Sequence, residues 1–411
     1  MRNDLSRKGF TALSENNKWK LRKGSPYYII REDGALIALV LGTEEEVTDG
    51  FRMVGAHTDS PCLQLKPKPD IHKQTLCQLG VEPYGGALVA PWFDRDLSLA
   101  GRVNCLSEDK RLRTLLIDFD KPLLSIPSVA IHLNREANEN PQINKHRHLV
   151  PIFALESGNP QPRFQDLLRQ RIKEQYPKQT ISEILSFDIF CYDYQKPNYL
   201  GAADAFIVGG RLDNLVSCYI GAAAMQQLDM KKNCLLFCAN HEENGSTSTS
   251  GAQGTFLRSL FDRIYPDAET KRIGLANSFF ISMDNAHATH PNYADKSDEN
   301  HNIFLNKGPV IKINANQRYA TSSVSAAIYK TICKQAKVMP QEFVMRSDMP
   351  CGSTIGPLTA AQLGIRTVDV GIASFAMHSI REMTGRSDPL FLYRSIHSFM
   401  RSTIHREVVN V

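Results

Sequence analysis

The sequence predicts an α/β protein in which a mostly parallel sheet is flanked by helices and interrupted by an inserted, largely β domain. In two segments of the chain, apolar strand-like runs alternate with helical patterns, which is typical of a largely parallel sheet covered by helices. Between these segments the strand-like runs look antiparallel. Because chains tolerate insertions at exposed loops, we expect residues 1–86 and 204–411 to form one discontinuous domain and residues 87–203 to form the inserted one.

The first segment begins with a predicted β-hairpin. Residues 27–31 and 36–41 are apolar runs on either side of an Asp-Gly pair, which favours a tight turn. Residues 51–56 form a further apolar run that ends at His57, and we expect a strand there.

The second segment alternates helices and strands. Apolar and small residues at helical spacing predict helices over residues 212–228, 251–261, 322–336 and 389–406. Buried strands are predicted over residues 234–239, 278–283 and 366–371. In the inserted segment we expect strands over residues 113–119 and 184–194, and a helix over residues 164–176.

The composition excludes several classes of protein. The 411 residues are 42% hydrophobic and 22% charged, which is ordinary for a globular protein and excludes a disordered or collagen-like one. The longest apolar runs, such as residues 35–41, fall short of the roughly 20 residues that a membrane helix needs, and residues 1–10 show no secretory signal. The net charge of +5 has no long basic run, so nucleic acid and anionic membranes are not expected partners. Nine cysteines without a CxxC pair indicate reduced core thiols and a cytoplasmic protein.

Charged residues follow four of the predicted strands where those strands end. In open α/β sheets, ligands bind outside the carboxyl ends of the strands, so these side chains are expected to converge on one crevice. The set comprises His57 and Asp59, Glu242 and Glu243, Asp284, His378 and, at the start of a predicted helix, Asp213.

Taken singly, each of these residues has an ordinary structural explanation. Asp213 is in a position to cap a helix, and a lone His57 is more often a satisfied polar residue than a ligand. Adjacent glutamates are usually a solvated surface pair. Glu242 and Glu243, however, follow a buried strand, where two like charges are costly unless a cation compensates them. The joint pattern therefore indicates a metal site.

The residue types define the chemistry of that site. Two imidazoles and three carboxylates suit Zn²⁺, and also Co²⁺ or Mn²⁺. One aspartate bridging two ions makes a two-metal hydrolase, in which a carboxylate that binds no metal acts as general base. Asp59 is placed to orient the His57 ring. The sequence has no HExxH helix, Walker A loop or G-x-S-x-G elbow, so catalysis by a serine or cysteine nucleophile has no support.

At these residues the sequence resembles the M18 family of metallopeptidases, the aspartyl aminopeptidases. The likeness runs in order from about residue 27 to near the C-terminus. The matching stretches are residues 55–61, 210–214, 242–243 with 245–246, 284–287, 290–293, 308–312, 350–357 and 377–382.

The resemblance implies a zinc-peptidase-like fold and a role for each residue of the set. One zinc is expected between His57 and Asp284, and a second between Glu243 and His378, with Asp213 bridging the two. Glu242 is the expected general base, and Asp59 the residue that orients His57.

The resemblance also implies a substrate and an assembly. Members of the family prefer peptides with N-terminal Asp or Glu, and Lys312 matches the position proposed to bind the acidic side chain; its alternative is a strand lysine that faces solvent. His287 and His290 are expected to line the pocket. The inserted domain forms dimers that assemble into a tetrahedral dodecamer. His132 is the candidate that reaches a neighbouring subunit's site, and its alternative is a structural strand histidine.

The sequence departs from the family pattern at three places. Residues 1–10 align poorly with the usual N-terminal helix, Asn240 and His241 replace an acidic residue before the glutamate pair, and Asn244 replaces a branched apolar residue.

Two other functions remain open: a different amide hydrolase on the same metal core, such as a deacylase, and a catalytically silent assembly protein.

Overall fold

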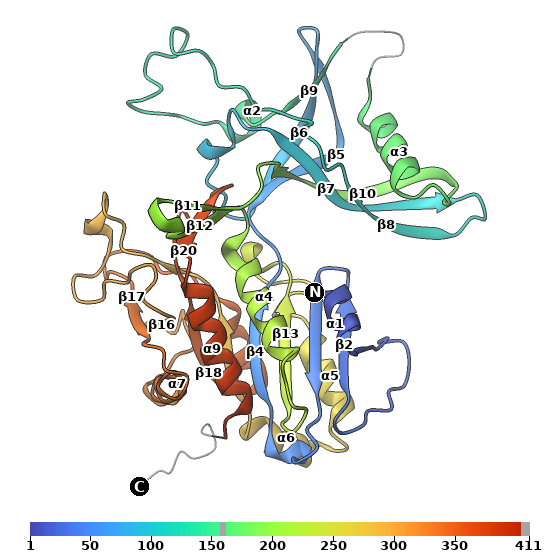
Figure 1. Ribbon diagram of the computed structural model, residues 1–411. Coiled ribbons are helices and arrows are strands. Elements are labelled where there is room, and N and C mark those ends of the chain that lie inside the picture. The colour runs from blue at the N-terminus through green and yellow to red at the C-terminus, as the bar shows by residue number, and fades with distance from the viewer. Residues whose placement is uncertain (157–161, 404–411) are drawn as a thin grey trace. The chain divides into compact units, whose positions relative to one another are not determined.

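The computed structural model describes residues 1–156 and 162–403 (Figure 1). The chain forms two compact units. Unit 1 consists of residues 1–59, residues 199–377 and the described residues from 382 onward. Unit 2 consists of the described part of residues 60–198, together with residues 378–381.

The centre of unit 1 is a nine-stranded sheet with the order β1-β2-β3-β13-β4-β14-β18-β16-β17. Strands β13, β4, β14 and β18 run parallel to one another, whereas β2 and β3 form the predicted antiparallel hairpin. The mostly parallel sheet of the predicted α/β fold is thus confirmed. The strands are β1 (Thr11–Ala12), β2 (Pro26–Arg31), β3 (Ala35–Val40), β4 (Arg52–His57), β13 (Cys234–Ala239), β14 (Phe279–Met283), β16 (Val310–Ile313), β17 (Gln341–Val344) and β18 (Arg366–Gly371).

Helices cover both faces of this sheet. Alternate side chains of one strand enter different cores: Leu236 of β13 packs with α4, α7 and α9, whereas Leu235 and Phe237 pack with α5 and α8. Burial on both faces explains why these strands appear in the sequence as continuous apolar runs. The helices of unit 1 are α1 (Arg2–Arg7), α4 (Leu212–Met225), α5 (Phe256–Ile264), α6 (Ala268–Ala276), α7 (Ser323–Gln335), α8 (Ile355–Leu363) and α9 (Asp388–Arg401).

Two predicted helices differ most from the structure, each at one end. The helix expected from residue 251 begins only at Phe256. Gly251 and Gly254, which precede it, pack so closely on the backbone of residues 246–249 that a Cβ at either would clash. The closing helix α9 ends at Arg401, and the last residues of its predicted range lie outside the described part of the chain.

Unit 1 has a second sheet of five strands, with the order β11-β12-β20-β19-β15. Its strands are β11 (Asn198–Leu200), β12 (Phe206–Gly209), β15 (Ala286–His287), β19 (Ala373–Phe375) and β20 (Glu382–Gly385). Strands β12 and β20 are antiparallel, with Gly209 opposite Glu382.

Unit 2 is built on a six-stranded antiparallel sheet with the order β8-β7-β10-β5-β6-β9. Residues 60–86, which we assigned from sequence to the first domain, group with this unit because β5 pairs with both β6 and β10. The elements are β5 (Cys62–Lys73), β6 (Leu76–Tyr84), β7 (Leu97–Ser107), β8 (Leu112–Asp118), α2 (Lys145–His148), β9 (Ile152–Leu155), α3 (Phe164–Gln175) and β10 (Ile181–Asp193).

Two further features bear on the class of protein. Among the described residues, no helix is both long enough and apolar enough to cross a membrane. The cysteines are thiols, most of them buried, and no disulfide joins them in the described structure.

Candidate metal centre

The carboxyl ends of three neighbouring parallel strands bring the predicted ligands together. His57 is the last residue of β4, and Asp284 directly follows β14. Glu242 and Glu243 form the short 3-10 turn η4 (Glu242–Asn244) just after β13. Asp213 enters from the first turn of α4, which packs on the same sheet.

Four of the five predicted metal ligands lie in one buried cluster. Single ligand atoms of His57, Asp213 and Glu243 lie within 4.8 Å of one another. The Nε2 atom of His57 is 3.4 Å from Oδ1 of Asp213 and 4.0 Å from Oδ1 of Asp284. His57 and Asp213 are each only 2% exposed. One imidazole and three carboxylates at this spacing fit Zn²⁺, which takes nitrogen and oxygen ligands.

The electrostatics of the cluster also indicate a cation. Burial, reinforced by the charge of Asp213, raises the pKa of Glu243 above its usual range. Burial likewise raises the pKa of Asp284, to about 8. Burial lowers the pKa of His57, but its hydrogen bonds with Asp213 and Asp59 outweigh that effect and raise the pKa overall. The carboxylates thus hold protons at a site where a metal ion would replace them.

Asp59 contacts both the histidine and the glutamate turn. Its carboxylate accepts the N–H groups of Glu242 and Glu243, each at 3.1 Å. The Nδ1 atom of His57 lies 3.0 Å from the main-chain oxygen of Asp59 and 3.5 Å from its carboxylate. The predicted contact with His57 is therefore present, and the carboxylate in addition fixes the turn that carries both glutamates.

Lys312 lies beside Asp284 in the interior. It is 3% exposed, so the alternative of a strand lysine that faces solvent is wrong. Its Nζ is 3.4 Å from Oδ2 of Asp284 and donates to the Asn285 carbonyl at 3.0 Å. The ring of Tyr319 lies 4.8 Å from the same nitrogen. The centre therefore contains one buried ammonium group next to a predicted metal ligand.

The two histidines predicted to line the pocket sit among aromatic rings in unit 1. The His290 ring lies 5.1 Å from the rings of Tyr293 and Phe375, measured between centroids. His287, at the end of β15, is 6.0 Å from Phe343. These contacts fix the rings, and their role toward a substrate stays a prediction.

The other two predicted histidines belong to unit 2. The Nδ1 atom of His378 lies 3.2 Å from the Gly86 carbonyl oxygen, and the backbone of His378 is left-handed, with φ of 66°. His132 is exposed and lies in a turn, so the alternative of a strand histidine does not hold. Their places in the active site stay predictions.

Two contacts that we did not anticipate fix the start of α4. The N–H of Asp213 donates to Oε2 of Glu382 at 2.8 Å, and the Asn214 side-chain amide donates to the Met283 carbonyl at 2.7 Å. In the sequence, Glu382 is marked only by its place at the end of the matching stretch 377–382, in which His378 is the predicted metal ligand.

The raised carboxyl pKa values predict that zinc affinity weakens as the pH falls. In the folded, metal-free protein Asp284 keeps its proton up to about pH 8, whereas in the unfolded chain it loses the proton near pH 4. The stability of the metal-free protein therefore falls as the pH rises from about 4 to about 8. Zinc must displace these protons, so its apparent dissociation constant should rise about tenfold per pH unit for each proton displaced between pH 8 and pH 6. Competition with a chelator at several pH values measures this slope, and a flat profile would contradict it.

Comparisons with known proteins identify relatives of this chain over nearly its whole length. A family model described as "Aminopeptidase I zinc metalloprotease (M18)" matches residues 1–400. A relative from Stutzerimonas stutzeri, named probable M18 family aminopeptidase 2, is 48% identical over 398 residues, which are 97% of this chain and 92% of the relative. A chain in the cryo-EM structure of the Ape4 and Nbr1 complex is 36% identical with a TM-score of 0.95, and the match covers 100% of this chain and 83% of that one. The S. cerevisiae mApe1 dodecamer structure is 26% identical with a TM-score of 0.85, over 99% of this chain and 93% of that one.

Proposed function

The chain belongs to the M18 family of zinc metallo-aminopeptidases, and we propose that it is a dinuclear enzyme that removes Asp or Glu from the N-terminus of peptides. The observation that carries the proposal is the largely buried cluster of one imidazole and three carboxylates with the Lys312 ammonium beside it. In this proposal His57 and Asp284 would hold one zinc and Glu243 and His378 the other, with Asp213 as a ligand that both could share. Bound zinc supplies Lewis acidity to the scissile carbonyl and lowers the pKa of the attacking water.

Glu242 is the proposed general base. It is the glutamate of the η4 turn that this ligand set leaves without a metal, and burial raises its pKa toward the range useful for proton transfer. Asp59 holds its backbone N–H, which keeps the carboxylate at the cluster. Glu242 takes the proton from the attacking water and returns it to the departing amine of the peptide.

Lys312 is proposed to recognise the acidic side chain of the substrate. A carboxylate that enters a buried pocket needs a charged partner, and the Lys312 ammonium is a buried cation beside Asp284. With Asp284 as a ligand, a bound metal would share its negative charge, and the charge of Lys312 would be available to the substrate. His287 and His290 are proposed to complete the pocket, and His132 is proposed to reach the site of a neighbouring subunit.

Replacing Lys312 with methionine should therefore change specificity. We expect kcat/KM for an Asp p-nitroanilide to fall roughly 10- to 100-fold, as for a lost hydrogen bond to a charged group, and kcat/KM for the Ala anilide to fall much less. Lys330→Met removes a lysine of an exposed ion pair with Glu342 and is the matched control, with no change expected. Equal losses on both substrates, with zinc content intact, would remove Lys312 from recognition.

A substrate panel tests the proposed function as a whole. Zinc-loaded protein is assayed with Asp, Glu, Ala, Leu and Lys anilides and with N-acyl amino acids. We expect cleavage of the Asp and Glu anilides and little cleavage of the others. Turnover of the acyl amino acids alone would identify a deacylase, and no turnover by fully metal-loaded protein would favour the silent assembly protein.

We also propose that the chain assembles with itself and works in the cytoplasm. One relative of matching fold is a dodecamer, and unit 2 is the proposed dimerisation domain. Buried thiols without a disulfide in the described residues suit a reducing compartment. Light scattering after gel filtration should give twelve times the monomer mass, and a stable monomer at micromolar concentration would contradict the assembly.

A further inference from the structure

Glu382 reaches the start of α4 through the pairing of two short strands. It is the first residue of β20 and lies opposite Gly209, the last residue of β12. The chain leaves β12, turns at Arg211, whose φ is 64°, and enters α4 at Leu212, so that Asp213 lies in the first turn of the helix. This turn brings the backbone N–H of Asp213 to within 2.8 Å of the Glu382 carboxylate, which is buried at 2% exposure.

We propose that Glu382 is a positioning residue that holds the bridging ligand Asp213 in place for metal binding by accepting a hydrogen bond from its backbone N–H. This inference rests on the proposed role of Asp213 as the bridging ligand. A hydrogen bond to an ionised carboxylate is shorter and roughly twice as strong as one to a neutral acceptor. With its backbone fixed in this way, Asp213 directs its carboxylate toward His57, 3.4 Å from the ring nitrogen.

A second carboxylate of the centre makes the same kind of contact. Asp59 accepts the backbone N–H groups of Glu242 and Glu243 as Glu382 accepts that of Asp213. Two buried carboxylates thus fix the main chain at three residues of the centre before any metal arrives. Groups that orient metal ligands in this way typically change metal affinity 10- to 100-fold when they are removed.

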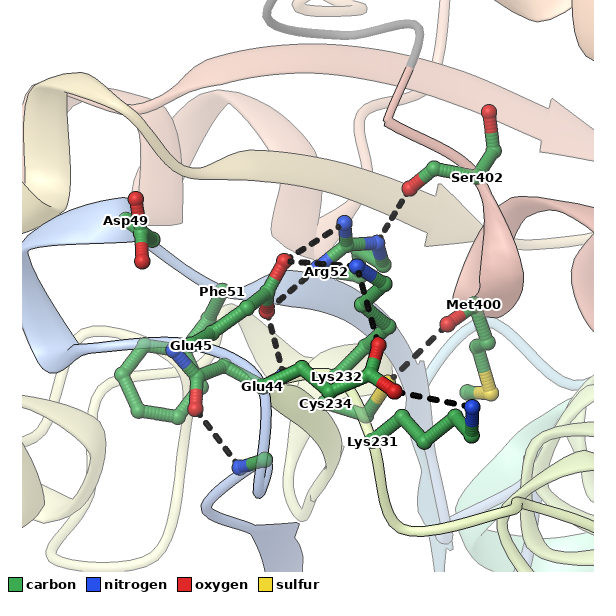
Figure 2. A network of polar contacts seen from close by, with 12 residues as sticks. Glu44, Glu45, Asp49, Phe51, Arg52, Lys231, Lys232, Cys234, Met400 and Ser402 are labelled. Atoms are coloured by element: carbon green, nitrogen blue, oxygen red, sulfur yellow. Dashed lines mark hydrogen bonds and ion pairs between the residues drawn. The ribbon is translucent and has the colours of Figure 1, made fainter.

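The rival explanation is that Glu382 only stabilises the fold, and Glu45 provides a matched control. Glu45 is also a buried glutamate, 4% exposed, and it accepts a backbone N–H, that of Asn233, at the same distance of 2.8 Å. It lies with Arg52 in the polar network at the amino end of β4 (Figure 2). Because β4 ends at His57, the strand places this network about 17 Å from the metal centre.

Zinc affinity, measured by competition with a chromophoric chelator, separates the two explanations. For Glu382→Ala we expect a zinc dissociation constant 10- to 100-fold weaker than that of the wild type. Glu382→Gln keeps the hydrogen-bond acceptor and loses the charge, so its zinc dissociation constant should lie between those of the wild type and Glu382→Ala. Glu45→Gln should lower the melting temperature without changing zinc affinity. The visible spectrum of the Co²⁺-loaded protein should shift in the Glu382 variants and not in Glu45→Gln.

Wild-type zinc affinity and an unchanged Co²⁺ spectrum in both Glu382 variants would overturn the inference. If Glu382→Ala does not fold, Glu382→Gln still decides it by the same two measurements. Neither measurement uses a substrate. A wild-type protein that binds zinc but cleaves no acidic anilide would therefore refute the proposed function and leave the result for Glu382 standing.

Discussion

Glu242→Gln should lower kcat for an Asp anilide by about 10²- to 10⁴-fold, the usual contribution of a general base. Glutamine keeps the shape of the side chain and cannot take a proton, whereas the N–H that Asp59 holds is unchanged. Zinc content and KM should therefore stay close to the wild-type values. Steady-state kinetics with metal analysis on the same sample measure both effects.

Glu243→Gln is the comparison that separates the two glutamates. Because Glu243 is a proposed ligand, the Glu243→Gln variant should lose both zinc and activity. The Glu242→Gln variant should lose activity alone. Turnover close to wild type in Glu242→Gln would remove Glu242 as the base. Loss of zinc from that variant would instead make Glu242 a ligand.

Arg52→Met should destabilise unit 1 by about 3–5 kcal/mol, because it leaves the buried Glu45 carboxylate without its cation. Arg52 is fully buried, and its two terminal nitrogens contact Glu45 at 3.0 and 3.1 Å (Figure 2). It also donates to the Ser402 carbonyl just after α9, so the pair anchors the last helix to the sheet.

Urea unfolding measures this loss, with Arg52→Met/Glu45→Leu as the control. The double variant removes both charges and should recover much of the stability, as replacement of buried ion pairs by apolar residues does elsewhere. A single variant within about 1 kcal/mol of the wild type would show that water reaches Glu45 and that the pair contributes little.

The sheet of unit 1 was predictable because its central strands are buried on both faces. The apolar run of residues 234–239 coincides with β13, and the charged residues that follow such strands identified the edge where the centre lies. The start of unit 2 was not predictable, because the pattern of β5 and β6 does not reveal that β5 pairs with β10 across more than a hundred residues.

The side chains that form the candidate site were more predictable than the contacts that hold them in place. His57, Asp213, Glu243 and Asp284 carry side chains whose chemistry is visible in the sequence. The hydrogen bond between Glu382 and Asp213 uses a backbone N–H, which every residue except proline has. No residue pattern therefore reveals this contact. The burial of Lys312 likewise depends on the packing around β16, a short strand in which this lysine stands among apolar residues.

Crystallographic location of zinc by its anomalous scattering tests the central claim most directly. We expect two zinc ions per subunit, both contacting Asp213, with His57 and Asp284 on one and Glu243 and His378 on the other. Zinc bound elsewhere in fully loaded protein, with the carboxylates of Asp213 and Glu243 contacting no metal, would contradict the account.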